Sequence, residues 1–357
     1  MPSRARTWLR RLLLGVIVLA LGLAAAGMVF QVGASMRDAR RFPAPGRLLD
    51  VGDGRGLHLL CQGAGLPVVV LEAGNLSFSL QWAWITPGVA RATRVCAYDR
   101  AGYGWSDGAP WPPTAGRQAD DLARLLRLAG EPGPYVLVGH SYGALVTRAF
   151  AARYREAVAG VVLVDPAHPS QQDVQRCDPA CLPAALLRDM RRIYSLAPLL
   201  ARFGILRIVR SDTHGLFSLV KSFPVEIRPT IAAKLSSTRH WVTGAAEMAH
   251  FEESARDARA LTSLDGKSLV VVAADSTWAK HSDGYRLPEG VDGAALDRTI
   301  LDLNRDQARL SAASELVVVP GATHASLATS ERDAGRVVEA IRTVVARVRD
   351  AHGVAGK

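Results

Sequence analysis

The stretch GHSYG, residues 139–143, places a serine between two glycines directly after the apolar run 135–138. A serine at the apex of a tight turn between a strand and a helix is held in strained backbone angles, and its flanking residues must be small because side chains there would collide with the neighbouring strand and helix. Such a turn exposes the hydroxyl group to a substrate. We therefore predict that Ser141 is a nucleophile, flanked by Gly139 and Gly143.

A serine hydroxyl needs a base, and His324 is the candidate. At neutral pH the hydroxyl is a poor nucleophile until an imidazole accepts its proton, and that imidazole needs a carboxylate to fix its tautomer and stabilise its cation. His324 follows a predicted strand and a glycine turn. His168 is the rival, because it lies just beyond another predicted strand. We expect His140, which precedes the serine, to face away from it.

Two aspartates are candidates for the carboxylate. Asp165 directly follows the apolar run 161–164, and Asp275 follows the run 269–273, so both preserve the order serine, acid, histidine. Without a catalytic role, Asp165 would cap a loop through backbone N–H groups before Pro166, and Asp275 would be a solvated turn residue. Both assignments stay open at this point.

The elements that must position these residues alternate between strand-like and helix-like pieces. Most predicted strands are short, rich in valine and apolar on both faces, which is typical of strands covered by helices on both sides of a mostly parallel sheet. The predicted strands are 48–51, 57–61, 68–71, 94–98, 135–138, 161–164, 269–273 and 316–319. The predicted helices include 117–128, 144–154 and 332–349. The long interval after 164 lacks a clear strand, so we predict a helical insertion there that acts as a lid.

The N-terminal region predicts a membrane anchor. Residues 12–36 carry no charge, and the apolar run 12–30 would reach roughly 28 Å as a helix, close to the thickness of a bilayer's hydrocarbon core. The basic residues immediately before this run are Arg4, Arg6, Arg10 and Arg11. They favour a cytoplasmic start, with the rest of the chain on the extracytoplasmic side. A signal peptide cleaved after Ala34 is the alternative reading.

The net charge of +10 does not indicate nucleic-acid binding. Four of these charges are the N-terminal arginines, and beyond position 34 the chain holds 39 basic and 33 acidic residues, interspersed along helical stretches. Such a pattern is typical of a solvated surface. The spacing of Cys177 and Cys181 predicts a local disulfide and no metal site, since no histidine or second cysteine pair stands at zinc-site spacing.

Five motifs together resemble the α/β-hydrolase superfamily over residues 47–349. Besides GHSYG they are VVVLEAGN (68–75), VCAYDRAGYGWSD (95–107), VVLVDPAHP (161–169) and VVVPGATH (317–324). The set looks like a bacterial membrane-associated branch of that superfamily. The resemblance implies a mostly parallel eight-stranded sheet with helices on both faces and a helical lid inserted after strand six. The expected division of the chain is an anchor at 1–34, a linker at 35–46, a core at 47–165 and 268–350, and a lid at 166–267.

The resemblance also implies site residues. The backbone N–H groups of Tyr142 and Asn75 would form the oxyanion hole. The superfamily's usual acid lies after strand seven, near Asp275, whereas haloalkane dehalogenases use the position of Asp165, which we favour. Glu72 stands where many members carry a different motif, and we expect it to hydrogen-bond within its loop.

Further expectations concern neighbouring residues. We expect the charged cluster Asp99, Arg100 and Asp107 to order the floor of the site through hydrogen bonds. Since strand two of the superfamily's sheet runs antiparallel beside strand four, the resemblance makes a disulfide between Cys61 and Cys96 plausible.

The combined hypothesis is a membrane-anchored serine hydrolase. It would cleave an ester-like bond through an acyl-enzyme, on a small substrate with an apolar portion, and would need no metal or organic cofactor. Thioester, amide and acyl-transfer chemistry remain open. The alternative from another class is a hydrolase-like fold kept as a binding or scaffold module at the membrane, with Ser141 idle.

Overall fold

The computed structural model describes residues 4–171, 184–209, 215–278, 287 and 292–353. Its centre is an eight-stranded sheet in the order β1-β2-β4-β3-β5-β6-β7-β8. The strands are β1 (Arg47–Asp50), β2 (Gly56–Gln62), β3 (Val69–Glu72), β4 (Val95–Tyr98), β5 (Tyr135–His140), β6 (Val158–Val164), β7 (Ser268–Ala274) and β8 (Ser314–Val319). β2 pairs antiparallel with both β1 and β4, and every other neighbouring pair is parallel. The predicted sheet is therefore confirmed.

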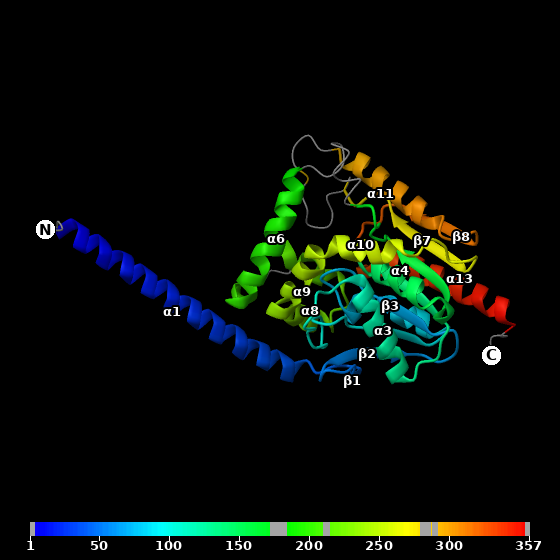
Figure 1. The fold of residues 1–357 in the computed structure, drawn as a ribbon, viewed down its shortest axis with the longest axis horizontal. Helices are drawn as coiled ribbons and strands as arrows, with labels where there is room; N and C mark the ends of the chain where they lie inside the picture. The colour runs from blue at the N-terminus through cyan, green and yellow to red at the C-terminus, as the bar shows by residue number, and fades with distance from the viewer. Residues whose placement is uncertain (1–3, 172–183, 210–214, 279–286, 288–291, 354–357) are drawn as a thin grey trace.

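Helices cover both faces of the sheet, as predicted (Figure 1). One face packs against α3 (Ala115–Ala129), α4 (Gly143–Arg153) and α10 (Phe251–Arg259), and the other against α2 (Thr86–Ala90) and α13 (Glu331–His352). The central strands read as continuous apolar runs because both of their faces are buried. The remaining core helices are α11 (Gly293–Ala308) and α12 (Ser326–Thr329).

The insertion predicted to be a lid (166–267), for which we keep the name lid, consists mainly of helices among its described residues up to α10. They form α6 (Ala184–Arg202), α7 (Ile205–Ile208), the 3-10 helix η3 (Gly215–Ser222), α8 (Arg228–Leu235) and α9 (Thr238–Ala249). α10 differs from the expectation, because its residues Phe251, Ala255 and Ala258 are buried in the core beneath α3 and α4. The lid predicted to end at 267 therefore ends near His250 as a packing unit.

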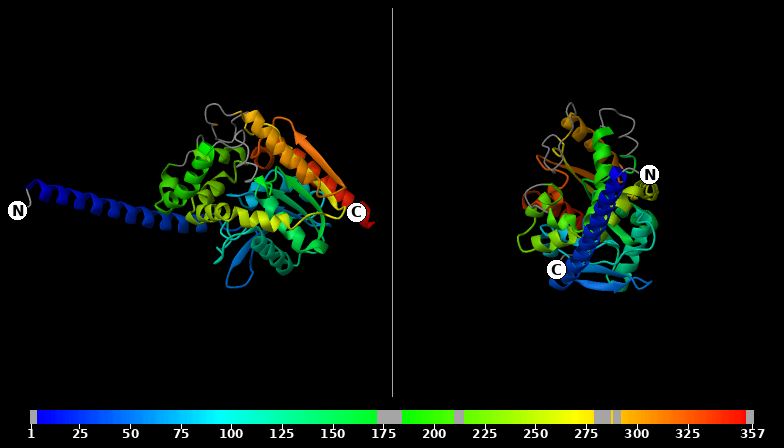
Figure 2. Two further views of the ribbon diagram at one scale, coloured as in Figure 1. Left: turned by 45° about the horizontal axis from the view of Figure 1, so that its top comes forward. Right: turned by 90° about the vertical axis from the view of Figure 1, so that its left-hand side faces the viewer.

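The N-terminal helix α1 (Arg4–Arg41) runs past the predicted anchor. Its first part projects away from the globular body, and its last part lies against the lid (Figure 2). The linker predicted at 35–46 is consequently shorter, since residues 35–41 are helical. Ser35 and Asp38 in this stretch accept hydrogen bonds from Arg207 of α7, so packing on the lid supports its helical conformation.

The cysteines on neighbouring strands are paired. Cys61 on β2 lies opposite Cys96 on β4, and their Sγ atoms are 2.03 Å apart, in the pairing that the resemblance implies. The predicted Cys177–Cys181 bridge lies outside the described residues.

Candidate active site

Ser141 stands at the turn between β5 and α4. Its backbone has φ 54°, a left-handed conformation that is uncommon for a residue with a side chain. A Cβ atom at Gly139 would lie 2.5 Å from Thr147 Oγ1, and one at Gly143 would lie 2.5 Å from the carbonyl oxygens of both Glu72 and Ala73. The two glycines therefore let β3, β5 and α4 approach closely enough to form this turn.

His324 and Asp165 join Ser141 in one hydrogen-bonded chain. His324 Nε2 lies 2.9 Å from Ser141 Oγ, and His324 Nδ1 lies 2.6 Å from Asp165 Oδ2. The three residues follow β5, β6 and β8, so the loop after β8 folds back across two strands to reach the serine. The histidine side chain is 38% exposed and the aspartate side chain 4%. The site thus has an accessible imidazole backed by a buried carboxylate.

Asp165 is held as an anion. Its Oδ1 accepts hydrogen bonds from the backbone N–H of Ala274 and from Asn304 Nδ2, both at 3.1 Å. Burial raises the pKa of Asp165, but the hydrogen bond and the charge of His324, with the Ala274 N–H, outweigh burial and lower it overall. An ionised carboxylate at Nδ1 favours the tautomer whose Nε2 can accept the serine proton.

Asp275 accepts a hydrogen bond from the backbone of the histidine loop, the segment between β8 and His324. Its Oδ1 accepts from the backbone N–H of Gly321 at 2.8 Å and from Ser276 Oγ at 2.6 Å. Nearby, Thr277 Oγ1 accepts the backbone N–H of His324 at 2.6 Å. The loops after β7 and β8 are tied together by these bonds, and the geometry favours Asp165 over Asp275 as the partner of His324.

His168 and His140, the two other histidines weighed from the sequence, occupy different places. His168 Nε2 lies 3.0 Å from Asp306 Oδ2. The expectation that His140 faces away was wrong, because its ring lies 4.7 Å from the His324 ring and its Nε2 donates to the His324 carbonyl oxygen at 3.0 Å. Burial lowers the pKa of His140 to about 3, so it is neutral and braces the backbone of His324.

The predicted oxyanion donors flank the serine. A Cβ atom at Gly74 would lie 3.3 Å from Ser141 Cβ, so the loop after β3 passes directly beside the nucleophile. Tyr142 follows Ser141 immediately, and Asn75 follows Gly74. Within the described ranges, neither the Tyr142 N–H nor the Asn75 N–H donates to a protein acceptor. Both groups can therefore serve a ligand.

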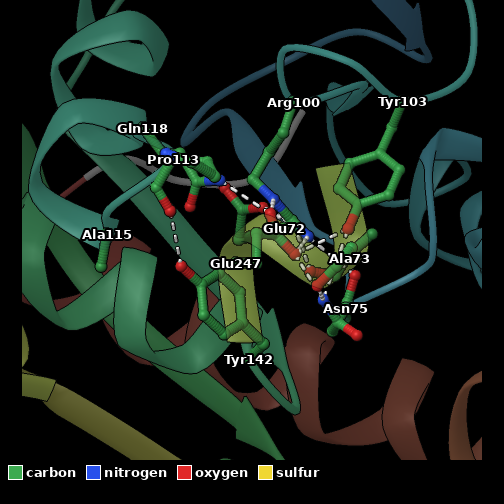
Figure 3. A network of polar contacts seen from close by, with 12 residues as sticks. Glu72, Ala73, Asn75, Arg100, Tyr103, Pro113, Ala115, Gln118, Tyr142 and Glu247 are labelled. Atoms are coloured by element: carbon green, nitrogen blue, oxygen red, sulfur yellow. Dashed lines mark hydrogen bonds and ion pairs between the residues drawn. The ribbon is translucent and has the colours of Figure 1, made fainter. Parts of the chain in front are cut away.

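Arg100 holds the loop that carries Asn75 (Figure 3). Its Nη1 donates to Glu72 Oε1 at 2.6 Å, and its Nε donates to Glu247 Oε1 at 2.8 Å. Its Nη2 donates to the Gly74 carbonyl oxygen at 2.8 Å. Because the C=O and N–H of a trans peptide point in opposite directions, this last bond fixes the direction of the Asn75 N–H.

The same network ties the lid to the loop. Asn75 Nδ2 donates to Glu247 Oε2 at 2.7 Å, and Asn75 Oδ1 accepts from Tyr194 OH at 2.7 Å. Glu247 lies on α9 and Tyr194 on α6, so two lid helices hydrogen-bond to the side chain of Asn75, the predicted oxyanion residue. Gln118 Nε2 adds a bond to Glu247 at 2.7 Å.

Two carboxylates share one buried cation in this network. Glu72 and Glu247 are 2% and 0% exposed, and both contact Arg100. Burial raises the pKa of Glu72 to about 7, although Arg100 and the Tyr98 hydroxyl oppose the rise. The nearby charge of Glu247 adds to the rise in the pKa of Glu72. The expectation that Glu72 bonds within its own loop was wrong, because its partners are Tyr98 and Arg100.

Sequence reasoning missed Glu247 and Asn304. Glu247 stands in the stretch GAAEMA, where a single acid among small and apolar residues of a lid helix signals a buried partner. Asn304 stands in the stretch LDLNRDQ on α11, which has several polar residues. The sequence therefore does not indicate which of them is buried. Both contacts bring together residues more than 130 positions apart.

One group of side chains has the ligand types of a metal site. Among the described residues, the ligand atoms close enough to share an ion belong to Cys61, Cys96 and Glu131, within 4.8 Å of one another. The two sulfur atoms are bonded to each other in the structure and are thus not free to bind a metal.

Comparison with known proteins points to one family. A sequence model of the protein family described as the alpha/beta hydrolase fold matches residues 67–197 of this chain. An AB hydrolase superfamily protein of Gibberella zeae is 36% identical over 103 residues, which are 28% of this chain and 32% of that protein. The chain spans less than half the length of the first curated relatives it matches, with shares from 15% to 42%.

Solved structures match over a longer range. An esterase from Thermogutta terrifontis is 23% identical with a TM-score of 0.57, covering 84% of this chain and 97% of that one. A haloalkane dehalogenase from Agrobacterium tumefaciens is 15% identical with a TM-score of 0.61, covering 85% of this chain and 96% of that one. At these identities the likeness concerns the fold.

The raised pKa of Glu72 predicts a pH-dependent stability. The pKa of the Glu72 carboxyl is about 7 in the folded protein and ordinarily 4.5. Its contribution to the free energy of unfolding is therefore fully present below pH 4.5 and is lost as pH rises through 7. Glu72→Gln removes this titration. We expect the Tm of wild type to fall more than that of Glu72→Gln between pH 5 and pH 8, measured by scanning fluorimetry in detergent. Parallel Tm profiles would contradict the assignment.

Proposed function

Because the chain belongs to the α/β-hydrolase superfamily, we propose that it is a serine hydrolase that cleaves an ester-like bond through an acyl-enzyme. The observation that carries this proposal is the chain of hydrogen bonds from Ser141 through His324 to Asp165, at 2.9 and 2.6 Å. A nucleophile, its base and the carboxylate that orients the base are the parts that such chemistry requires.

The proposed reaction has two halves. Ser141 Oγ attacks the ester carbonyl carbon while His324 Nε2 takes its proton, and Asp165 stabilises the imidazolium that forms. His324 returns this proton to the leaving alcohol as the tetrahedral intermediate collapses to the acyl-enzyme. A water molecule then attacks the acyl carbonyl carbon while His324 takes its proton, and His324 returns that proton to Ser141 Oγ as the bond to the acyl group breaks and the carboxylic acid leaves.

The negative charge on the intermediate's oxygen needs preorganised donors, and the N–H groups of Tyr142 and Asn75 are proposed for this role. Arg100 is proposed as the positioning residue of this pair, because it holds the carbonyl oxygen of Gly74 and so directs the Asn75 N–H. Its guanidinium is enclosed between the carboxyl groups of Glu72 and Glu247, so it acts on the loop and not on the substrate.

We further propose that α1 anchors the enzyme in a membrane, with the catalytic domain on the extracytoplasmic side. α1 is long and apolar enough to cross a bilayer, and its most apolar window is fully exposed. Retention of the helix is supported by its packing on the lid, since Gln31 Nε2 donates to the Ser236 carbonyl oxygen at 2.9 Å. The apolar residues of the lid suit a small ester substrate with an apolar portion.

The first prediction from the proposed function concerns the nucleophile. A fluorophosphonate probe should label the full-length wild type and should not label Ser141→Ala, because the probe traps an activated serine. Ser326→Ala, which removes a hydroxyl at the start of α12, is the matched control and should keep the label. A folded wild type that takes up no probe would contradict the proposal and favour an idle binding module.

The second prediction separates the two aspartates. Asp165→Asn should reduce kcat by ~10³ to 10⁴, as expected when the tautomer of the base is no longer fixed. Asp275→Asn should cost far less, because its bonds hold Gly321 and Ser276. Hydrolysis of a short p-nitrophenyl ester measures both. Equal losses in the two variants would contradict the assignment of Asp165.

The third prediction concerns Arg100. Arg100→Lys removes the directed bond to Gly74 and should lower kcat ~10- to 100-fold while KM changes little, since oxyanion contacts act mainly in the transition state. Arg148→Lys is the control, because Arg148 is also buried and also binds carbonyl oxygens, those of Ala258 and Leu261. If both variants lose kcat equally, Arg100 has only a structural role.

A further inference from the structure

The last third of α1 contacts the lid along one side, through a stripe of residues that begins at Gly27 and Phe30. A Cβ atom at Gly27 would lie 2.6 Å from the Phe203 carbonyl oxygen, and one at Gly204 would lie 2.7 Å from the Phe30 ring. The stripe continues through Gln31, which accepts from Arg207 Nε at 2.7 Å. Close backbone approach at both glycines makes the direction of α1 relative to the lid well defined.

Polar contacts extend this stripe beyond the apolar run. Arg207 Nη1 donates to Asp38, and Arg207 Nη2 donates to Ser35 Oγ at 3.1 Å. Gln31, Ser35 and Asp38 recur every three to four residues, so they lie on one side of the helix. α1 is therefore anchored to the lid by polar bonds just outside the segment proposed to span the bilayer.

These contacts set the level of the lid relative to that segment. The apolar run ends at Phe30, and Gly27 lies about 4.5 Å further in along the helix axis. The turn at Phe203 and Gly204 touches α1 at this depth. If the run occupies the hydrocarbon core, the turn lies at the bilayer boundary.

The lid exposes apolar side chains around this turn. The exposed fractions are 52% for Leu196, 49% for Leu199, 37% for Ile205, 71% for Ile208 and 62% for Val209. They form no part of the lid's own core, which buries Ala197 and Ala201 of α6 and Leu206 of α7. Clustered exposed apolar residues mark an interaction surface.

The lid also lies on the side of the globular body that would face the bilayer proposed for α1. In Figures 1 and 2 the lid helices form the end of the globular body from which the free half of α1 projects. Exposed arginines lie on the aqueous side of this boundary: Arg202 directly precedes the turn, and Arg37 and Arg40 lie about 10 and 15 Å beyond Phe30 along the helix axis. Cationic side chains beside exposed apolar ones suit the headgroup and acyl boundary of a membrane containing anionic lipid.

We propose that the surface formed by Leu196, Leu199, Ile205, Ile208 and Val209 docks into the bilayer that holds α1, so that the lid is itself a membrane-binding element. This inference rests on the proposed anchoring role of α1. It assigns the occupant of the surface as lipid, in preference to a second copy of the chain.

The chain supplies matched reporters for a test without mutation. Leu48 on β1 and Leu128 on α3 are 54% and 46% exposed, fractions similar to those of Leu196 and Leu199. The full-length chain is placed in nanodiscs of phosphatidylcholine and phosphatidylglycerol, and hydroxyl-radical oxidation is followed residue by residue by mass spectrometry. Leucines share one intrinsic reactivity, so rates compare directly.

We expect Leu196 and Leu199 to be oxidised at least threefold more slowly than Leu48 and Leu128, in nanodiscs holding one chain each. Equal rates, with Leu19 and Leu21 of α1 protected, would overturn the docking surface and leave the anchor intact. Oxidation of Leu19 and Leu21 at the rate of Leu128 would overturn the anchor and the docking together. Protection of Leu196 only in discs that hold two chains would identify a second copy as the occupant and overturn the proposal.

Discussion

The left-handed backbone at Ser141 is the constraint on which the rest of the site depends. A residue with a side chain adopts this conformation only when its surroundings enforce it, and here Gly139 and Gly143 let β5, α4 and the end of β3 close around the turn. The turn places the hydroxyl at the edge where parallel strands end. Asp165 and the loop carrying His324 reach the same edge because β6, β7 and β8 follow in order beside β5.

A second constraint acts through burial. Arg100 is enclosed between Glu72 and Glu247, and its remaining donors are directed to the backbone of the loop beside Ser141. A buried cation needs all of its bonds satisfied, so the loop has little freedom to move while the network is intact. Since Glu247 belongs to the lid, the position of the lid and the position of the Asn75 N–H are linked. The lid's contacts with α1 extend this link toward the membrane.

The sheet could be predicted because each strand carries a local signal, a short valine-rich run buried on both faces. β6 begins at Val158, three residues before the prediction, because Ala159 and Gly160 carry no strand signal and extend only by pairing with neighbouring strands. Tertiary contacts also explain why α1 extends past its predicted end and why α10 packs in the core. Likewise, Arg100 and Glu247 meet through tertiary packing that no local pattern records. The residues at strand ends were predictable, but their supporting partners were not.

The central claim, that Ser141 carries the acyl group, is tested most directly by trapping that intermediate. A p-nitrophenyl ester mixed rapidly with the full-length protein should release one burst equivalent of p-nitrophenol, and acid quenching followed by peptide mass spectrometry should find the acyl mass on the peptide that contains Ser141. Turnover without any acylated Ser141, or an acyl group on a different residue, would contradict the account.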